Sequence, residues 1–330
     1  MNDTNIKIFC SGGCGFLGAN VIKYLNSLGY NNIDIFEPAG WPAKWKNLIG
    51  LKYNDIYDNT IMYSEVMRYC VSSKCIVIAL GANSATSAEP TNAIYDQNTT
   101  FSNKLIRLAA KNPNIKLIHA SSASVYGSEE QDFTERVSGL EPINFYAWTK
   151  LKTDEYLESL NFPYNIYSLR FFNVYGSKLE QYKGPMASVI YKWLTQTIDR
   201  SNPIQLFKSL RPDYQDGMQE RDFINYLDIC RIIYHCMVTD NPGGIYNCGT
   251  GKTGNWLEIA GLVLKNRGIG QIFDDANDYI EFVDMPEKLV NSYQYRTCAN
   301  IDRLRNVLGY KDEFISLADG IKKTWEEINA

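Results

Sequence analysis

The sequence predicts an α/β protein, built as a doubly wound parallel sheet with a smaller, interleaved α/β domain. Three observations predict this fold class. Short apolar runs alternate with helix-length amphipathic segments through the first half of the 330 residues, as is typical of repeated β-α-β units. A glycine-rich turn directly follows the first apolar run. After Gly176 the pattern of apolar and polar residues changes, and a second, smaller unit is expected there.

The elements expected in the first half follow from the length and periodicity of their apolar residues. Short β-like runs are expected to be strands of the parallel sheet. Longer segments with apolar residues every three or four positions are expected to be helices. The expected strands are 6–10, 32–36, 75–80, 115–120 and 165–171, and the expected helices are 16–28, 93–110 and 146–160.

The second half predicts a smaller lobe. A helix is expected at 185–198 and a short strand at 203–207, before a polar, turn-rich stretch at 209–219. Because no linker rich in Gly, Ser or Pro separates the halves, the two lobes are expected to interleave and to share a cleft, the usual place for a ligand. One domain is expected to comprise 1–173, 221–250 and 290–308, and the other 174–220, 251–289 and 309–330.

The composition argues against several classes of protein. The formal net charge of -4, with Lys and Arg scattered, predicts neither a nucleic-acid partner nor an anionic membrane partner. The polar residues 1–5 lack the basic and apolar regions of a signal peptide, and no apolar stretch approaches a membrane span, so a cytoplasmic protein is expected. The 8 cysteines form no Cys-x-x-Cys pair and only 2 histidines are present, so we expect free thiols and no metal site.

The glycine-rich turn at 11–18 predicts a dinucleotide site. Gly12, Gly15 and Gly18 form the pattern Gly-x-x-Gly-x-x-Gly directly after a strand, where it opens a helix. Glycines let the backbone approach a pyrophosphate closely, and the helix N-terminus offers N–H groups to it. A tight turn without a ligand is the alternative, but the position within a β-α-β unit favours a Rossmann-type dinucleotide-binding domain.

Glu37 is expected to select the cofactor, because it ends the second strand about 20 residues after the glycines. A carboxylate there can accept hydrogen bonds from both adenosine ribose hydroxyls and would repel a 2′-phosphate, which favours NAD. NADP stays open because Lys44 and Lys46 follow and could reach a phosphate. The other expected cofactor contacts are Phe16 and Leu17 on the first helix, Asp55 and Ile56 beside the adenine, Leu80, Gly81, Ala82 and Ser84 after a strand, and Asn98.

Tyr146 and Lys150 are the candidate catalytic pair, since their spacing of four residues puts them on one face of a helix. A cation beside the phenol favours phenolate and would lower the tyrosine pKa from about 10 toward neutrality. Ser122, where a strand ends, can hydrogen-bond the reacting oxygen. Taken alone, Tyr146 and Lys150 could merely pack on a helix. Together the three residues resemble the Ser-Tyr-Lys triad of the short-chain dehydrogenase/reductase superfamily, in which the tyrosine and lysine also contact the cofactor.

Segments of the second half resemble the extended branch of that superfamily, the NAD-dependent epimerase/dehydratase family, which modifies nucleotide sugars. The segments 170–176, 221–223 and 246–251 are similar to motifs of this branch. The segments 182–189 and 285–289, with Tyr293, look like those of the ADP-L-glycero-D-manno-heptose 6-epimerase family, and the resemblance runs over nearly the whole chain. It implies a tightly bound NAD or NADP, a nucleotide-diphosphate sugar as substrate and a homo-oligomer.

The resemblance also implies roles for particular residues. Tyr146 and Lys183 are expected to flank the sugar as two acid/base groups, while a hydride leaves a heptose carbon and returns to its opposite face. A solvated loop lysine is the alternative for Lys183. The implied substrate-binding residues are Ser84, Ser122, Asn173, Val174, Lys183, Ser188, Lys192, Phe207, Arg221 and Tyr293.

Departures from the family pattern leave the substrate open. Glu37 and Pro38 stand where the family usually has Asp-Asn, and Asn59 stands where it has a phosphate-reading lysine, which weakens the case for NADP. Pro185 replaces a serine that touches substrate, and 210–217 includes an insertion near the nucleotide pocket. The nucleotide is therefore ADP or GDP, and an NAD-dependent dehydrogenase or 4-epimerase that oxidises C4 of a related sugar is the alternative.

Two further readings are disfavoured. A dehydratase of this branch carries Asp-Glu directly after the catalytic hydroxyl, whereas Ala123 and Ser124 stand there. A non-catalytic nucleotide-binding protein would keep the fold without the chemistry. The intact Ser122, Tyr146 and Lys150 argue against it.

Overall fold

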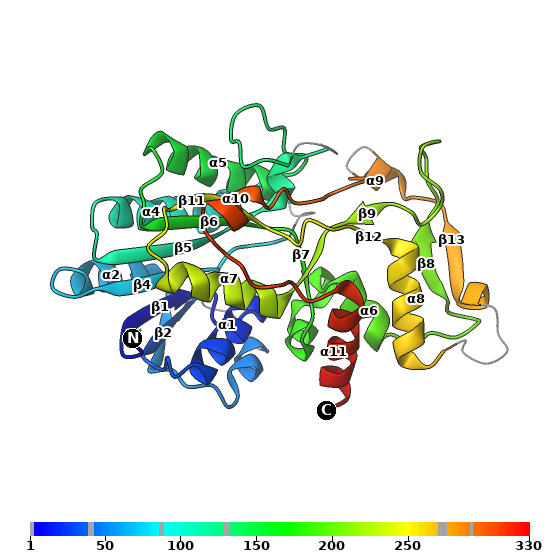
Figure 1. Cartoon of the computed structure of the whole chain (residues 1–330), viewed down its shortest axis with the longest axis horizontal. Helices are drawn as coiled ribbons and strands as arrows, with labels where there is room; N and C mark the ends of the chain where they lie inside the picture. Colours follow the sequence, from blue (N-terminus) through cyan, green and yellow to red (C-terminus); the bar gives the residue numbers. More distant parts are fainter. Residues whose placement is uncertain (1–2, 39–42, 86–88, 129–132, 270–275, 291–292) are drawn as a thin grey trace.

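The computed structural model describes residues 3–38, 43–85, 89–128, 133–269, 276–290 and 293–330 (Figure 1). Residues 1 and 2 of the polar start, and the parts of the two expected domains that fall in the gaps, lie outside the described residues. Within the described chain a seven-stranded sheet has the order β11-β6-β5-β4-β1-β2-β3, and every pair in it is parallel. Its strands are β1 (Lys7–Ser11), β2 (Ile33–Glu37), β3 (Asp55–Asp58), β4 (Cys75–Ala79), β5 (Ile115–Ser122), β6 (Ile166–Phe171) and β11 (Gly244–Cys248).

This sheet confirms the predicted fold class and fixes the place of a ligand. The chain runs outward from β1 through β2 to β3, then crosses to β4 on the other side of β1 and continues outward. The strand order therefore reverses between β1 and β4. Loops that leave the carboxyl ends of the strands at such a point diverge and form a crevice, where ligands of doubly wound proteins bind.

Helices cover both faces of the sheet and bury two separate cores. On one face α1 (Phe16–Ser27) packs beside α7 (Tyr226–Val238), and Ile22, Ile118 and Ile233 belong to one buried cluster. On the other face lie α2 (Met62–Tyr69), α4 (Phe101–Ala110) and α5 (Phe145–Ser159), which bury Val66, Leu105 and Leu157 against the strands. Because helices cover both faces, the central strands are continuous apolar runs.

The helix expected at 93–110 exists, but it is not uniform. It consists of α3 (Asn92–Tyr95), a π-helical turn η3 (Asp96–Thr100) and α4. In the π turn, Asn98 Nδ2 donates to Thr149 Oγ1 at 3.1 Å, and Thr99 Oγ1 donates to the Thr149 carbonyl at 3.0 Å. The widened turn therefore directs two buried polar side chains toward α5, the helix that carries Tyr146.

A third core forms the smaller lobe, at the right of Figure 1. It joins residues that are far apart in sequence, including Ile190, Ile204, Val263 and Ile321. The boundaries of the two expected domains stay a prediction. The lobe's elements include η5 (Lys178–Met186), α6 (Val189–Thr195), β8 (Ile204–Phe207), β9 (Glu220–Arg221), β12 (Gly254–Asn255), α8 (Trp256–Arg267), η6 (Ala276–Tyr279), β13 (Ile280–Val283), α9 (Glu287–Val290) and α11 (Leu317–Asn329).

Short elements connect the lobe to the sheet. The two-stranded pair β7 (Asn173–Tyr175) and β10 (Phe223–Asn225) is parallel, while β8 pairs with β13 and β9 with β12. The remaining described elements are η1 (Lys44–Leu48), η2 (Asn59–Ile61), η4 (Ala123–Tyr126) and α10 (Asp302–Asn306).

The helix expected at 185–198 begins later and ends earlier than predicted. Pro185 belongs to the 3-10 segment η5, which kinks at Gly184 with φ 56. The helix α6 starts only after Ser188, whose hydroxyl accepts a hydrogen bond from the Tyr191 N–H at 3.1 Å. The prediction of one helix is wrong here because the kink and the serine cap divide the segment into two.

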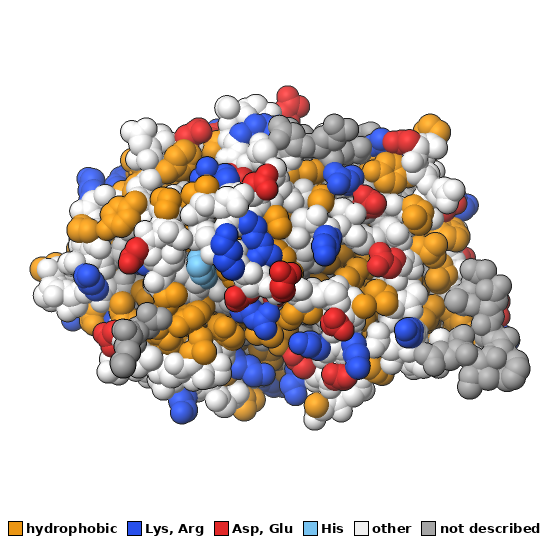
Figure 2. Space-filling model, viewed as in Figure 1, with side chains coloured by type: hydrophobic (Ala, Val, Ile, Leu, Met, Phe, Trp, Pro, Cys, Tyr) orange, Lys and Arg blue, Asp and Glu red, His pale blue; other side chains and the backbone are white. Residues whose placement is uncertain are grey.

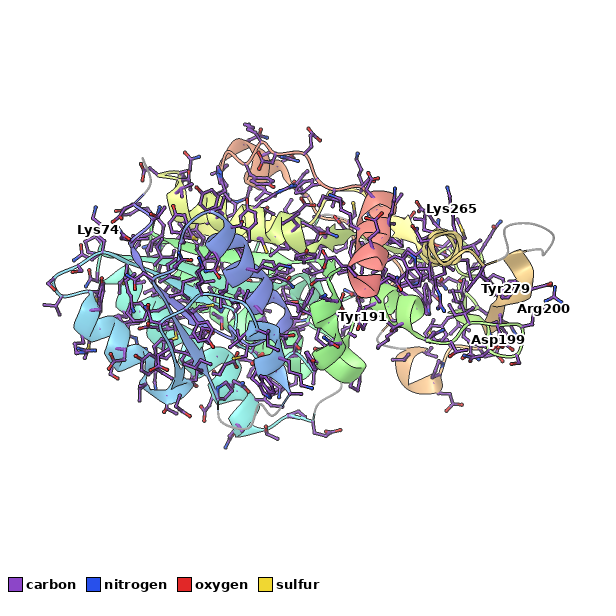
Figure 3. All side chains as sticks on the ribbon, turned by 90° about the horizontal axis from the view of Figure 1, so that it is seen from below. Lys74, Tyr191, Asp199, Arg200, Lys265 and Tyr279 are labelled. Carbon is purple, nitrogen blue, oxygen red and sulfur yellow. The ribbon has the colours of Figure 1, made fainter. Side chains whose placement is uncertain are left out.

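Charged side chains lie at both ends of the molecule. Figure 3 shows Lys74 at the sheet end and Asp199, Arg200 and Tyr279 at the far end of the smaller lobe. On the face drawn in Figure 2, Lys and Arg side chains are interspersed with Asp and Glu. Among the described helices, none combines the length and apolar character needed to span a bilayer.

Candidate active site

The glycine-rich turn lies between β1 and α1, at the reversal point of the sheet. Gly12 has φ 75, and a Cβ on it would lie 2.6 Å from the Gly81 nitrogen. A Cβ on Gly18 would lie 2.1 Å from the Gly12 carbonyl oxygen. Only glycine fits at both positions, since the strand-to-helix turn and the loop after β4 approach each other closely.

The start of α1 is suited to a diphosphate. Gly15 occupies the N-cap and supplies no side-chain acceptor for the first N–H groups of the helix. Those N–H groups and the helix dipole favour an anion at this end. Beside the turn, Asn47 donates to the Cys14 carbonyl at 3.0 Å, while its buried Oδ1 accepts no hydrogen bond from the described residues. The uncapped helix and the unpaired oxygen both fit a bound dinucleotide.

Glu37 ends β2 beside the same turn. Its Oε1 accepts the Cys14 N–H at 2.7 Å, and the residue is 5% exposed. Burial raises the pKa of this carboxyl, and the hydrogen bond from Cys14 opposes the shift. Glu37 therefore ends the second strand, as the sequence predicts, and its hydrogen bond with Cys14 also supports the glycine-rich turn. Its predicted contact with the ribose stays a prediction.

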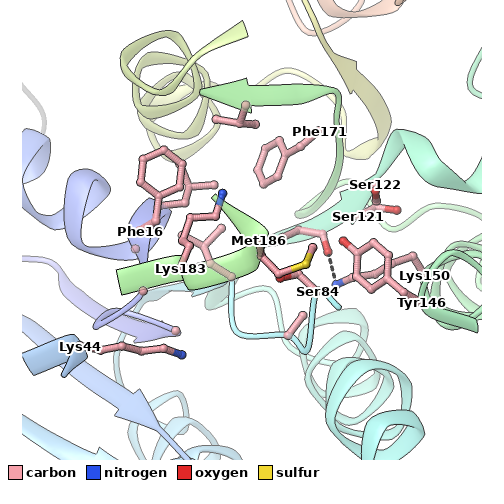
Figure 4. Close-up of a pocket in the computed structure, with 18 of the residues that line it drawn as sticks. Phe16, Lys44, Ser84, Ser121, Ser122, Tyr146, Lys150, Phe171, Lys183 and Met186 are labelled. Atoms are coloured by element: carbon pink, nitrogen blue, oxygen red, sulfur yellow. Dashed lines mark hydrogen bonds between the residues drawn. The ribbon is translucent and has the colours of Figure 1, made fainter. Parts of the chain in front are cut away.

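Ser122, Tyr146 and Lys150 meet at one wall of the pocket, on β5 and α5 (Figure 4). The Tyr146 hydroxyl and Ser122 lie close enough to interact. Lys150 is 2% exposed and donates from Nζ to the Ala120 carbonyl at 2.7 Å, with Nζ 6.0 Å from the centre of the Tyr146 ring. The sequence prediction that strand end and helix would converge is consistent with this geometry.

The electrostatics differ from the expectation that Lys150 alone makes the phenol acidic. Burial raises the pKa of Tyr146 above its ordinary value, and the hydrogen bond with Ser122 opposes this shift. Burial also lowers the pKa of Lys150 to about 8, and the nearby Asp154 carboxylate offsets part of the effect. In this arrangement desolvation is the largest influence on the pKa of both groups.

Asp154 lies one turn beyond Lys150 on α5 and is fully buried. It accepts hydrogen bonds from Ser121 Oγ at 3.0 Å, Ser168 Oγ at 2.9 Å and Arg170 Nε at 2.8 Å. Sequence analysis missed this residue, although its spacing of four from Lys150 was a usable signal. It links the catalytic helix to β5 and β6 behind the pocket.

Lys183 forms the opposite wall of the pocket (Figure 4). Its Nζ lies 4.7 Å from the centre of the Phe16 ring and 3.6 Å from Oε2 of Glu180. Burial lowers the pKa of Lys183, and the Glu180 carboxylate opposes the shift. Lys183 therefore faces the pocket, in contrast to a freely solvated loop lysine. Glu180 is a second residue that sequence analysis missed, three positions before the lysine.

The pocket has a volume of about 390 Å³ and unites much of the predicted site. Asn47, Ser121, Phe171, Tyr182 and Met186 also line it, and sequence analysis did not select them. The predicted residues that line it are Gly12, Gly15, Phe16, Leu17, Gly18, Lys44, Leu80, Ala82, Ser84, Ser122, Tyr146, Lys150, Val174 and Lys183. The predicted residues outside its lining are Glu37, Asp55, Ile56, Gly81, Asn98, Asn173, Ser188, Lys192, Phe207, Arg221 and Tyr293.

Several predicted cofactor residues do not line the pocket, but some of them contact the segments that form its walls. Gly81 abuts Gly12, and its N–H donates to Ser11 Oγ at 3.4 Å. Asn98 holds the loop after β4, because its Oδ1 accepts the Asn83 N–H at 2.8 Å. Asp55 is exposed and Ile56 is half-buried at the start of β3. Their predicted contact with the adenine stays a prediction.

Three predicted substrate residues form a separate cluster in the smaller lobe. The Arg221 guanidinium carbon lies 5.1 Å from the Tyr293 ring centre and 5.8 Å from that of Trp256. Trp256 Nε1 donates to the Tyr293 hydroxyl at 2.9 Å, and the Phe207 and Tyr293 ring centres are 6.0 Å apart. Trp256, at the start of α8, had no motif by which the sequence could reveal it.

The other predicted substrate residues lie around η5. Lys192 donates from Nζ to the Pro185 carbonyl at 2.6 Å, and Ser188 donates from Oγ to Oε1 of Glu180 at 2.9 Å. Asn173 is exposed on β7. The structure therefore gives Ser188 and Lys192 a part in holding η5, and their contact with substrate stays a prediction.

Fold and site together define a Rossmann-type protein in which Tyr146 and Lys183 face one pocket beside a glycine-rich turn. The family model of the NAD dependent epimerase/dehydratase family matches residues 8–249. The chain belongs to this family, which confirms the predicted family and the predicted class of cofactor.

Curated relatives extend the match over the whole length. The chain is 33% identical over 322 residues to the ADP-L-glycero-D-manno-heptose-6-epimerase of Fusobacterium nucleatum, covering 96% of each chain. It is 33% identical over 315 residues to the enzyme of the same name from Nitratidesulfovibrio vulgaris, covering 94% of each.

Solved structures share the fold. The ADP-L-glycero-D-manno-heptose-6-epimerase of Helicobacter pylori matches with a TM-score of 0.77 at 23% identity, over 100% of this chain and 99% of that one. A UDP-N-acetylglucosamine 4-epimerase from Methanobrevibacter ruminantium, in complex with UDP-N-acetylmuramic acid, matches with a TM-score of 0.78 at 21% identity, over 99% and 98%.

Proposed function

We propose that the protein is a 6-epimerase of an ADP- or GDP-linked glycero-manno-heptose that acts by transient oxidation. The observation that carries this proposal is the position of Tyr146 and Lys183 on opposite walls of one pocket, beside the dinucleotide turn. Inversion of a carbon needs proton transfer at the same oxygen from two directions, because the oxygen occupies a different place in each epimer. Two acid/base groups that face each other meet that need.

Tyr146 serves one epimer. Its phenolate accepts the proton of the sugar hydroxyl as the carbon is oxidised, and the resulting phenol returns that proton when the ketone is reduced. Ser122 lies beside this hydroxyl at the pocket wall and can donate to the reacting oxygen. Lys150 keeps a buried positive charge behind the phenol.

Lys183 serves the other epimer from the opposite wall. Its lowered pKa makes the neutral amine accessible, and the charged form can donate the proton back. A bound NAD would supply reversible acceptance of the hydride of the sugar carbon, so that no net oxidation results. We propose that the start of α1, Asn47 and Glu37 hold the cofactor, with Glu37 favouring NAD over NADP.

The nucleotide is proposed to lie over Arg221, Tyr293 and Phe207, where a guanidinium and aromatic faces are available for phosphates and a base. The insertion within 210–217 packs beside this cluster. Arg211 lies 4.9 Å from the ring centre of Tyr295, which is 5.5 Å from that of Tyr293. This contact places 210–217 beside the proposed nucleotide site, so the base or sugar need not be that of the relatives. A C4 dehydrogenase or 4-epimerase of a GDP-heptose is therefore the second candidate.

Incubation with ADP-heptose and GDP-heptose, separately, tests the proposal. We expect NMR to show the 6-epimer of one of them, while absorbance shows no accumulation of reduced nicotinamide. Accumulation of a keto-sugar with reduced cofactor would establish the dehydrogenase, and an epimer inverted at C4 would establish the 4-epimerase. If no bound dinucleotide is released on denaturation and neither sugar reacts, the proposal of an enzyme is wrong.

We also propose that the protein is a cytoplasmic homo-oligomer, as the relation to nucleotide-sugar enzymes suggests. Cell fractionation and light scattering test the two statements separately.

A further inference from the structure

Glu180 is a carboxylate buried at the base of the Lys183 wall. Its relative exposure is 0%, and it lies on η5 within the smaller lobe. Oε1 accepts the Gly176 N–H at 2.9 Å and the Ser188 hydroxyl at 2.9 Å, and Oε2 accepts the Ser188 N–H at 2.6 Å. An ionised carboxylate out of water is costly unless donors surround it. These three donors let Glu180 stay charged where it is.

The same carboxylate meets the ammonium of Lys183. Oε2 lies 3.6 Å from Lys183 Nζ, whose side chain is 26% exposed. On its other side Nζ lies over the face of Phe16, the first residue of α1, with 4.7 Å to the ring centre. Lys183 is thus held between a carboxylate of the smaller lobe and a ring at the cofactor turn, both of which favour a positive charge.

Other charged and titratable groups around this pair come from several elements. Lys192 on α6 repels Lys183. Tyr191, also on α6, lies close enough to interact with Glu180 and with Tyr182 on η5. Across the pocket stand Lys44 on η1 and Tyr146 on α5. Glu180 is the carboxylate that ion-pairs with Lys183, and it does so from a buried position.

We propose that Glu180 is a positioning residue, which holds the Lys183 amine at the pocket wall and keeps its proton available for transfer. This inference rests on the proposed function, since it assigns a partner to the second acid/base group. The four bonds of Glu180 join Gly176, Lys183 and Ser188, so the carboxylate also closes η5 around its kink.

Glu180→Gln tests the proposal, because glutamine keeps the size of the side chain but has no charge. The amide oxygen can take the place of Oε1 and accept from the Gly176 N–H and the Ser188 hydroxyl, while the NH₂ group then faces both the Ser188 N–H and Lys183. We expect Lys183 to lose its proton at lower pH than in the wild type. The Lys183→Met variant identifies the limb of the pH–kcat profile that belongs to Lys183, and in Glu180→Gln this limb should move to lower pH. The value of kcat near neutrality should fall roughly tenfold to a hundredfold, which is part of the ~10²–10⁴ that a positioned acid or base contributes.

A second measurement does not depend on the substrate. The rate at which an amine-acylating reagent labels Lys183, followed by mass spectrometry as a function of pH, reports the neutral amine directly. In Glu180→Gln the labelling should begin at lower pH. Phe16→Leu should shift it in the same direction but less, since a ring contributes less than a charge.

Glu65→Gln is the matched control. Glu65 pairs with Arg68 three positions away, as Glu180 does with Lys183, but Arg68 is 78% exposed and neither residue lines the pocket. Glu65→Gln should leave both the pH–kcat profile and the pH dependence of Lys183 labelling unchanged. Equal loss of kcat at every pH with unshifted labelling would overturn the proposal and leave Glu180 a structural residue. Shifted labelling in a protein that epimerises neither sugar would instead contradict the proposed function alone.

Discussion

The two walls of the pocket hold their lysines in different ways. On the α5 wall Lys150 is 2% exposed and donates to a main-chain carbonyl, and its carboxylate partner Asp154 is shared with Ser121, Ser168 and Arg170. On the η5 wall the Lys183 side chain is 26% exposed and pairs directly with Glu180. The difference indicates that Lys150 acts through the phenol in front of it, whereas Lys183 can itself meet a substrate.

The backbones of the two walls also differ. The α5 wall stands on a regular helix of 15 residues and on the central sheet. The η5 wall is a 3-10 segment with a kink at Gly184 and is held by side-chain contacts to the smaller lobe. A wall built on the sheet is the more rigid of the two, and a wall built on a kinked segment depends on single residues such as Glu180.

The largest expected effect belongs to the turn that both walls share. Gly18→Ala places a Cβ 2.1 Å from the Gly12 carbonyl oxygen, so the turn must open and the cofactor site is lost. We expect purified Gly18→Ala to release no dinucleotide on denaturation. Gly261→Ala on α8 is the control, because no atom lies within 4 Å of the added Cβ. It should keep the cofactor, and an unchanged cofactor content in Gly18→Ala would show that the turn does not bind it.

Next in size is removal of the phenol from the α5 wall. Tyr146→Phe should lower turnover by roughly 10²–10⁴, because it removes a positioned acid/base group without changing the packing of the ring. Cofactor content and thermal unfolding should stay as in the wild type. Steady-state kinetics on the epimerised sugar measure the effect, and a fully active variant would exclude Tyr146 from the mechanism.

The buried pair behind the α5 wall should affect stability. Asp154→Asn leaves the fully buried Arg170 guanidinium without a counter-charge, which should cost about 3–5 kcal/mol of the free energy of unfolding. Denaturant titration measures it. Glu65→Gln, which breaks an exposed pair, should cost less than about 1 kcal/mol. Similar values for the two variants would contradict the distinction between buried and exposed pairs drawn here.

The pH dependence of stability provides a test of Lys150. Its pKa in the folded protein is about 8, below the ordinary lysine value of 10.5, so protonation disfavours the folded state. This penalty is complete below about pH 8 and shrinks as the pH rises toward 10.5. The stability difference between the wild type and Lys150→Met should therefore change in favour of the wild type across that range in the cofactor-free protein. A constant difference would show that Lys150 has an ordinary pKa.

The smallest expected effect concerns the start of α5. Asn144 Oδ1 accepts the Ala147 N–H at 2.9 Å and caps the helix. Asn144→Ala should cost about 1 kcal/mol, and Asn144→Ser should restore most of it. Thermal unfolding measures both. A loss of activity beyond the loss of stability would mean that the cap also positions Tyr146, which lies two residues later.

How well a feature could be predicted from the sequence depended on how far apart in the chain its interacting residues lie. Tyr146 with Lys150 and the three glycines are local patterns, so their helix and turn could be predicted from spacing alone. Asp154 and Glu180 were missed although they lie within four residues of their lysines, because an acidic residue at that spacing is more often a solvated surface partner. Trp256 could not be predicted, since only tertiary contacts bring it to Arg221 and Tyr293.

By itself the sequence determined the alternation of strands and helices, the phosphate-binding turn and the residues of the α5 wall, because hydrophobic periodicity and short spacings act within one or two turns of chain. Only the tertiary structure decided which carboxylates are buried, that Lys183 faces Tyr146 across the pocket, and that Phe16 of the cofactor helix lies under the Lys183 ammonium. These depend on desolvation and on contacts between different elements of the fold, such as that between Phe16 and Lys183, which no local pattern encodes.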